Sequence, residues 1–138
     1  MRFLYLLTAA LILFAGCTSS SQNKTLQELP ADLVELQYPG DTPHQPSKVY
    51  IDSVTKVTVE QQPVLLISGT FPDACTKLKE ATHVTEGNTV SLVLKAWRNP
   101  DVMCAQVLTS FSFIYDKLSP DELSSHSEVT INGTAYSY

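Results

Sequence analysis

The sequence predicts an all-β fold: an immunoglobulin-like antiparallel β-sandwich of about seven strands, which follows a signal peptide and a flexible tether. Three observations predict it. From Lys48 onward, apolar and polar residues alternate along many segments, which is typical of half-buried strands. Turn residues interrupt these segments at short intervals, and no long helical pattern occurs among them. About seven short strands need two packed sheets to bury their apolar faces.

Residues 1–16 have the composition of a bacterial signal peptide. Arg2 supplies one positive charge, and residues 3–14 form a nearly continuous apolar run. At about 1.5 Å per residue this run would reach roughly 18 Å as a helix, whereas the hydrocarbon core of a membrane is about 30 Å thick. Ala15 and Gly16 are small residues suited to cleavage. We therefore predict that residues 1–16 are removed.

The run Phe14-Ala15-Gly16-Cys17 resembles the lipobox of bacterial lipoproteins, with Phe14 where Leu is usual. The resemblance implies cleavage before Cys17, a diacylglycerol on its sulfur and acylation of the new amino terminus. Such chains would anchor the protein stably in a membrane. The alternative is an ordinary secretory signal with an incidental Cys17. Thr18 is not the Asp that often directs retention in the inner membrane, so we expect the cell envelope, at the outer membrane facing the periplasm.

Residues 17–47 are expected to form the lipidated amino terminus and a tether, and residues 48–138 the sandwich domain. The residues that follow Cys17 are polar, and residues 38–46 contain three prolines and a glycine. Residues 26–37 between them would form one or two helical turns or dock as an edge segment of a sheet.

The expected strands follow one another closely, with turn residues between them. Residues 48–60 alternate and are rich in β-branched side chains, which favour strands. Residues 64–71 form a short, nearly continuous apolar run, as in a central strand. Pro72-Asp73 is a turn signal, and Asn132-Gly133 is a strong hairpin signal. Further strands are expected in the hairpin of residues 77–97 around Glu86-Gly87-Asn88, in residues 104–115 and in the two short arms of residues 127–138.

The charge balance narrows the classes of partner. Cleavage before Cys17 would remove Arg2 from the nine Lys and Arg residues of the chain and none of its 14 acidic residues. The mature chain would carry a clear negative net charge, and it has no basic stripe with interleaved aromatic residues. We therefore expect no nucleic-acid binding and no electrostatic docking on anionic lipid. The expected membrane contact is the amino-terminal lipid alone.

The remaining cysteines favour a disulfide. If Cys17 is lipidated, Cys75 and Cys104 remain in a compartment where disulfides persist. A bridge between them would stabilise the fold by roughly 3 to 4 kcal/mol in the chain-entropy model. Two free thiols or a metal site are the alternatives. Zinc usually takes four close ligands, and no histidine lies within four residues of either cysteine.

Residues 65–138 are similar to a recurrent small domain of bacterial secreted proteins and lipoproteins. The similarity rests on three elements: Gly-Thr-Phe-Pro-Asp-Ala-Cys-Thr at 69–76, Cys-Ala-Gln at 104–106 and Val-Thr-Ile-Asn-Gly at 129–133. Phe71 takes the place of the usual Leu, and residues 119–128 lack the Gly-x-Tyr often seen before the last hairpin. The resemblance implies a β-sandwich with a Cys75–Cys104 bridge. It implies no activity, because these modules have no assigned function.

Residues that could carry chemistry are sparse. The sequence has no Gly-x-Ser-x-Gly and no His-Glu-x-x-His motif. His44, His83 and His126 are expected to be solvated surface residues, and Trp97 a packing residue. The acidic residues around Glu122 are expected to be surface acids rather than a calcium loop. We expect no enzymatic activity, no metal and no cofactor.

The expected function is a binding or structural role in the cell envelope, in which the sandwich is presented to a protein partner of unknown identity. End loops and open strand edges are the usual binding surfaces of such a fold. The alternative is an inhibitor of a hydrolase such as a lysozyme or a periplasmic protease, because a disulfide-held loop binds with a lower ordering cost. The candidate binding residues lie in two turns that the bridge would hold together: Phe71, Pro72, Asp73, Asn99, Pro100 and Asp101.

The lipid anchor is testable by replacing its acceptor. Cys17→Ser should remove metabolic labelling of the chain by fatty acid and leave the precursor uncleaved, because no thiol remains for diacylglycerol transfer. Both are read by labelling and by intact mass. Labelling that persists in the variant would refute the anchor.

Overall fold

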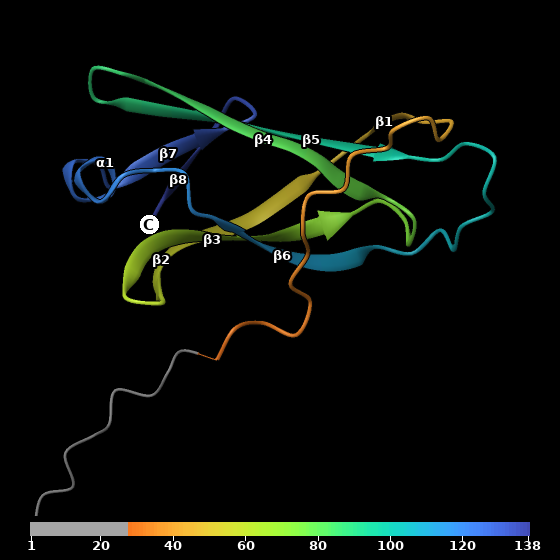
Figure 1. The fold of residues 1–138 in the computed structure, drawn as a ribbon, viewed down its shortest axis with the longest axis horizontal. Helices are drawn as coiled ribbons and strands as arrows, with labels where there is room; N and C mark the ends of the chain where they lie inside the picture. Colours follow the sequence, from red (N-terminus) through yellow and green to blue (C-terminus); the bar gives the residue numbers. More distant parts are fainter. Residues whose placement is uncertain (1–27) are drawn as a thin grey trace, which may run out of the picture.

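The computed structural model describes residues 28–138, which form eight strands and one short helix in two packed sheets (Figure 1). The strands are β1 (Gln45–Ser47), β2 (Tyr50–Val59), β3 (Gln62–Phe71), β4 (Lys77–Glu86), β5 (Thr89–Arg98), β6 (Thr109–Tyr115), β7 (Glu128–Ile131) and β8 (Thr134–Ser137), and the helix is α1 (Pro120–Ser125). The predicted β-sandwich is confirmed. The predicted signal peptide and Cys17 lie outside the described residues. No helix in residues 28–138 is both long and apolar enough to cross a membrane.

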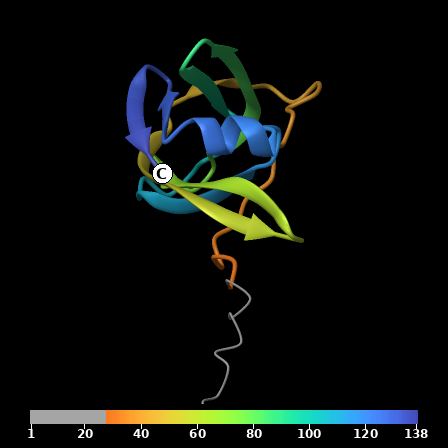
Figure 2. The ribbon, with the colours of Figure 1, turned by 90° about the vertical axis from the view of Figure 1, so that its left-hand side faces the viewer.

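The two sheets differ in how they are assembled. One sheet has the order β2-β3-β6 and is antiparallel throughout. In the other, β5 pairs with β4 along one edge, while β1 and β7 pair with the two ends of its opposite edge. The β5–β7 pairing is parallel over Ser91 and Leu92, and β8 continues the sheet beyond β7. Viewed from the end, the two layers enclose the core and α1 lies across it (Figure 2).

The core lies between the sheets and is made of the inward-facing residues that alternation predicts. Phe71 and Phe111 stack within it, with their ring centroids 4.3 Å apart. Gly69 is needed beside them, because a Cβ at this position would collide with the backbone oxygen of Tyr50 and with the Phe111 ring. The most deeply buried large side chains are Leu65, Ile67, Leu78, Val90, Leu92, Phe111, Tyr115, Leu123, Val129 and Ile131.

Residues 32–47, here called the strap, pack on the sandwich. This corrects the prediction that residues 17–47 form a tether and that the domain begins at residue 48. The Val34 amide donates to the Ser112 carbonyl at 2.8 Å, and the Ser112 amide donates to the Asp32 carbonyl at 2.9 Å. The strap thereby covers part of the outer edge of β6, as the edge-segment alternative anticipates. It then reaches the other sheet, where the Gln37 amide donates to the Leu78 carbonyl at 2.8 Å.

The strap also accounts for Trp97. This side chain is 7% exposed, and its indole Nε1 donates to the Gln37 carbonyl at 2.6 Å. The exposed His44 lies edge-on to the same ring, with centroids 6.0 Å apart. The prediction that Trp97 is a packing residue is confirmed. A buried indole N–H needs an acceptor, and the strap supplies it, which is one physical reason why this segment is not a free tether.

Two other boundaries differ from the predicted ones. Glu60 and Gln61 both have positive φ, 48° and 68°, and form a two-residue turn, so β3 begins at Gln62 rather than at Val64. The short helix α1 lies in a segment for which the sequence analysis predicts no regular element. Ser119 caps this helix by accepting from the Glu122 amide, and the Glu122 side chain accepts from the Ser119 amide.

The predicted Asn132-Gly133 turn between β7 and β8 is confirmed, and Asn132 has a second role. Both residues have positive φ, 50° and 89°. The Asn132 side chain donates to the Leu94 carbonyl and accepts from the Leu94 amide, each at 3.0 Å. It therefore occupies the stretch of the β5 edge between the residues paired with β7 and those paired with β1. The side-chain amide of Asn132 thus takes the place of the backbone amide and carbonyl of a neighbouring strand.

Asn132→Ala should lower the free energy of unfolding by about 1 to 3 kcal/mol, because the partly buried amide and carbonyl of Leu94 lose their partners. The positive φ of this position, which favours Asn over Ala, adds to the loss. Asn88→Ala, at the exposed turn of the β4–β5 hairpin, is the matched control and should change little. Chemical denaturation of the oxidised chain measures both. Equal effects of the two substitutions would contradict the bridging role of Asn132.

Candidate functional site

The candidate site is formed by two connections at one end of the sandwich: residues 72–76, which join β3 to β4, and residues 99–108, which join β5 to β6. We call them the short turn and the long loop. The long loop projects from the end of the molecule opposite α1 (Figure 1). Cys75 and Cys104 are bridged, with Cα atoms 5.7 Å apart, as the sequence predicts. The Ala74 amide also donates to the Ala105 carbonyl at 3.2 Å, so the connections are joined twice.

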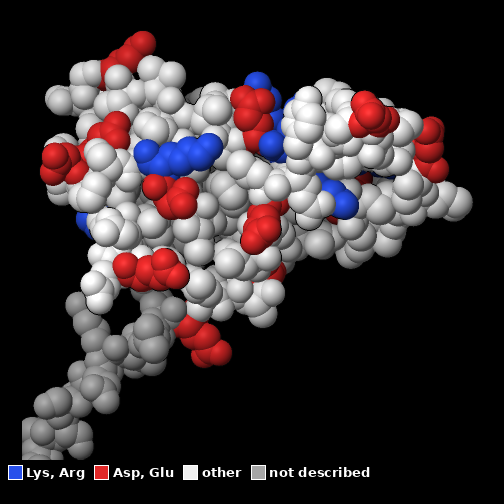
Figure 3. Space-filling view, viewed as in Figure 1, with Lys and Arg blue, Asp and Glu red and all other residues white. Residues whose placement is uncertain are grey.

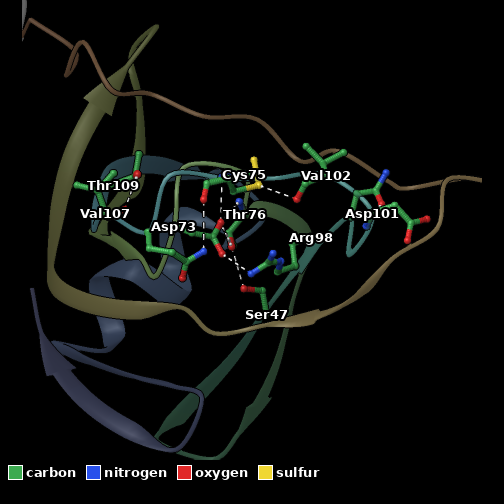
Figure 4. The surroundings of a disulfide bond; sticks show 12 residues. Ser47, Asp73, Cys75, Thr76, Arg98, Asp101, Val102, Val107 and Thr109 are labelled. Carbon is green, nitrogen blue, oxygen red and sulfur yellow. Dashed lines mark hydrogen bonds and ion pairs between the residues drawn. A yellow bond between two sulfur atoms is a disulfide. The ribbon is translucent and has the colours of Figure 1, made fainter.

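Asp73 organises the short turn. Its Oδ1 accepts from the Cys75 amide at 2.9 Å, from the Thr76 amide at 2.8 Å and from the Thr76 hydroxyl at 3.0 Å. Its Oδ2 accepts from the Arg98 guanidinium at 3.0 Å (Figure 4). Burial alone would raise the pKa of this carboxyl, but the hydrogen bonds and Arg98 outweigh burial and lower it. Ser47 of β1 in turn bonds the Thr76 hydroxyl at 2.8 Å.

The prediction that Phe71 and Asp73 bind a partner is wrong, because both side chains are buried. Phe71 is 3% exposed and Asp73 is 2% exposed, so neither can meet a partner. Phe71 faces inward because the alternation of β3 continues to its last residue. Asp73 turns inward because four donors surround its carboxylate. This agrees with the reading of Pro72-Asp73 as a turn signal, in which an Asp side chain binds nearby backbone amides.

The other predicted residues lie nearer the surface. Pro72 and Asn99 are partly buried, and Asn99 accepts from the Asp101 amide at 2.9 Å. Pro100 and Asp101 are exposed. Their role in binding stays a prediction.

The long loop exposes apolar side chains that the sequence analysis did not select. Residues 104–115 were expected to form one strand, but β6 begins at Thr109. Its partner β3 ends at Phe71, which pairs with Thr109, so the preceding residues have no strand to pair with. Because apolar and polar residues already alternate from residue 107 to residue 115, the sequence pattern does not show that the strand begins at Thr109. The exposed fractions are 46% for Val102, 99% for Met103, 54% for Val107 and 67% for Leu108.

A second polar cluster lies at the opposite end, where α1 meets β4. His83 was expected to be solvated, but its Nδ1 lies 2.6 Å from the hydroxyl of the buried Tyr115, and its Nε2 lies 3.7 Å from the Glu122 carboxylate. Burial and the nearby acidic groups raise the pKa of Tyr115, so its hydroxyl stays protonated at neutral pH. The cluster connects the helix to the sheet.

Glu122 joins this cluster to the helix cap. Hydrogen bonds from the Thr85 hydroxyl and from Ser119 lower the pKa of its carboxyl to about 2, with a smaller contribution from His83. His126 contacts the same residue through the backbone, because its Nδ1 donates to the Glu122 carbonyl at 2.8 Å. Across residues 28–138, no three His, Cys, Asp or Glu side chains are grouped so that they could hold a metal ion.

The sequence profile of the ORF11 beta-sandwich domain family matches residues 65–138, which is more than half of the chain. The chain belongs to this family. The span of this chain that matches the ORF11 beta-sandwich domain begins inside β3 and includes both cysteines of the bridge. The strap, which ends in β1, and strand β2 precede the matched span, although β1 and β2 each belong to one of the two sheets.

Two curated relatives also match the chain. They are the uncharacterized 10.2 kDa proteins in the HgiBIM 5'region and in the HgiEIM 5'region of Herpetosiphon aurantiacus, each 39% identical over 51 residues. The aligned part is 37% of this chain and 62% of each relative, so the chain spans less than two thirds of their length. No solved structure matches the chain. The comparisons therefore give the family of the chain and agree with its β-sandwich fold, and they carry no information on an activity.

The docking of α1 should depend on pH. A carboxyl whose pKa is lowered from 4.5 to about 2 stabilises the folded chain at neutral pH, and this stabilisation is lost as the pH falls through that interval. Glu122→Gln should flatten the dependence of the unfolding free energy on pH between about 4.5 and 2, whereas the exposed Glu128→Gln should not. Urea denaturation at several pH values measures it, and parallel curves for the two variants would argue against this role of Glu122.

Proposed function

We propose that this chain is a lipid-anchored protein of the cell envelope that binds a protein partner through the long loop. The observation that supports it is the exposure of Val102, Met103, Val107 and Leu108 within ten residues. Exposed apolar groups in one place are a common mark of protein interfaces. The Met103 side chain is 99% exposed and therefore buries no apolar surface within the fold, whereas contact with a partner would bury it.

The covalent support of the loop fits this role. A long loop that is free to move loses conformational entropy when it binds, and this loss weakens binding. Here Cys104 is bridged to Cys75, and the Ala105 carbonyl is held by the Ala74 amide. Asp73 in turn fixes the backbone on the Cys75 side of the bridge. The loop is thus attached in its middle as well as at its two ends.

The surface charge favours a protein partner over a nucleic acid. Acidic side chains are spread over the face in Figure 3, with few basic ones among them. Among the Lys and Arg side chains of residues 28–138, Lys95 forms an ion pair with Glu80 and Arg98 with Asp73. A lipid on Cys17, which is expected from the sequence, would hold the domain near a membrane, where a protein partner could be bound.

A photo-crosslinking side chain at position 103 of the full-length chain, expressed in its host, should yield one dominant adduct. The same probe at Thr58, an exposed residue of β2, is the matched control and should not give that adduct. Serine at positions 102, 107 and 108 should reduce the yield about tenfold, as expected when a few side chains carry most of the binding energy. The readout is mass spectrometry of the adducts.

The proposal would be wrong if positions 103 and 58 gave the same adducts, or if the serine substitutions left the yield unchanged while the disulfide and the fold were intact. Intact mass of the oxidised chain and its circular dichroism establish the latter.

A further inference from the structure

We infer that the long loop is a substrate-like loop for a serine endopeptidase, with Met103 as the side chain that enters an apolar primary specificity pocket. This rests on the proposed function of the loop as a protein-binding surface and names the class of its partner. The inference comes from the place of Met103 relative to the bridge, from its exposure and from the backbone conformation around it.

Met103 is presented outward directly beside a fixed point. It is 99% exposed, and the next residue, Cys104, is bridged to Cys75. Ala105 is held through its carbonyl by the Ala74 amide. The two residues after Met103 are therefore attached to the scaffold while its side chain stays free. An unbranched, flexible thioether side chain is well suited to fill a deep apolar pocket.

An endopeptidase cleft binds substrates in an extended form, and the relevant part of the loop is residues 103–106. They lie between the bend at Val102, which follows the turn at Pro100 and Asp101, and the bend at Val107. In residues 28–138, positive φ values at residues other than glycine occur at Glu60, Gln61 and Asn132, and no peptide bond is cis. Residues 99–108 contain no glycine, so the whole loop has negative φ values and trans peptide bonds. An extended segment needs both properties.

The bridge also explains why such a loop would inhibit rather than be consumed. The peptidase serine oxygen attacks the Met103 carbonyl carbon, the bond to the Cys104 nitrogen breaks, and this amine leaves with a proton from the peptidase histidine. The ester on Met103 and the new amine of Cys104 remain on one folded scaffold, because Cys104 is bridged to Cys75. The amine can therefore attack the ester and restore the peptide bond before water hydrolyses it.

The test uses the full-length oxidised chain in a nonionic detergent against three serine endopeptidases whose pockets are apolar, acidic and small. Stoichiometric chain should slow cleavage of a small chromogenic peptide by the first enzyme. Met103→Lys should weaken this inhibition about a hundredfold and create inhibition of the enzyme with the acidic pocket, a change typical of an interface residue that dominates binding. Val107→Lys adds the same charge to the same loop and should not create it.

Two results would overturn the inference: no inhibition of any of the three enzymes, or a Met103→Lys variant that inhibits the same enzyme as the wild-type chain. Neither result affects the proposed function, which position-specific crosslinking at residue 103 tests separately. An adduct with a partner other than a peptidase would keep the proposed function and reject the inference.

Discussion

The buried carboxylate of Asp73 is the contact on which the end of the molecule that carries the long loop depends. It joins the short turn to itself through Cys75 and Thr76, and to β5 through Arg98. A buried carboxylate is costly unless hydrogen bonds and an opposite charge surround it. Here both are present, and the turn that they define places Cys75 where it can reach Cys104. The long loop is therefore held in place by a charge at the end of the core as well as by its disulfide.

Much of the fold could be predicted because its signals are local. Alternation along β5 and the Asn132-Gly133 turn follow from neighbouring residues, and the Cys75–Cys104 bridge follows from counting cysteines. The strap could not be predicted in the same way. Its contacts with Ser112 and Leu78 run through backbone groups that every residue carries, and its three prolines are typical of linkers. The candidate site could be predicted in part. The two cysteines indicate which connections the bridge joins, but the start of β6 depends on where β3 stops, and only the tertiary structure determines that.

The central strand of the larger sheet shows how polar groups complete a β-sandwich. One edge of β5 is paired by β4 over its length, while the other edge is shared by β7, the Asn132 side chain and β1. Two short strands and one side chain together satisfy an edge that a single strand would otherwise cover. An unpaired edge invites association with other chains, so this arrangement keeps the centre of the sheet closed.

The course of the strap determines how the domain carries mechanical load. Force applied to the chain ahead of residue 32 reaches the sandwich first through the bonds that Asp32 and Val34 make with Ser112, and then through the bond between Gln37 and Leu78. These contacts are few and break one after another, whereas β1 and β5 share three paired residues. Pulling would therefore lengthen the free chain and uncover the Trp97 indole while the bridged loop and both sheets remain in place. The part of the strap ahead of β1 can therefore detach under load and lengthen the chain before the sandwich itself unfolds.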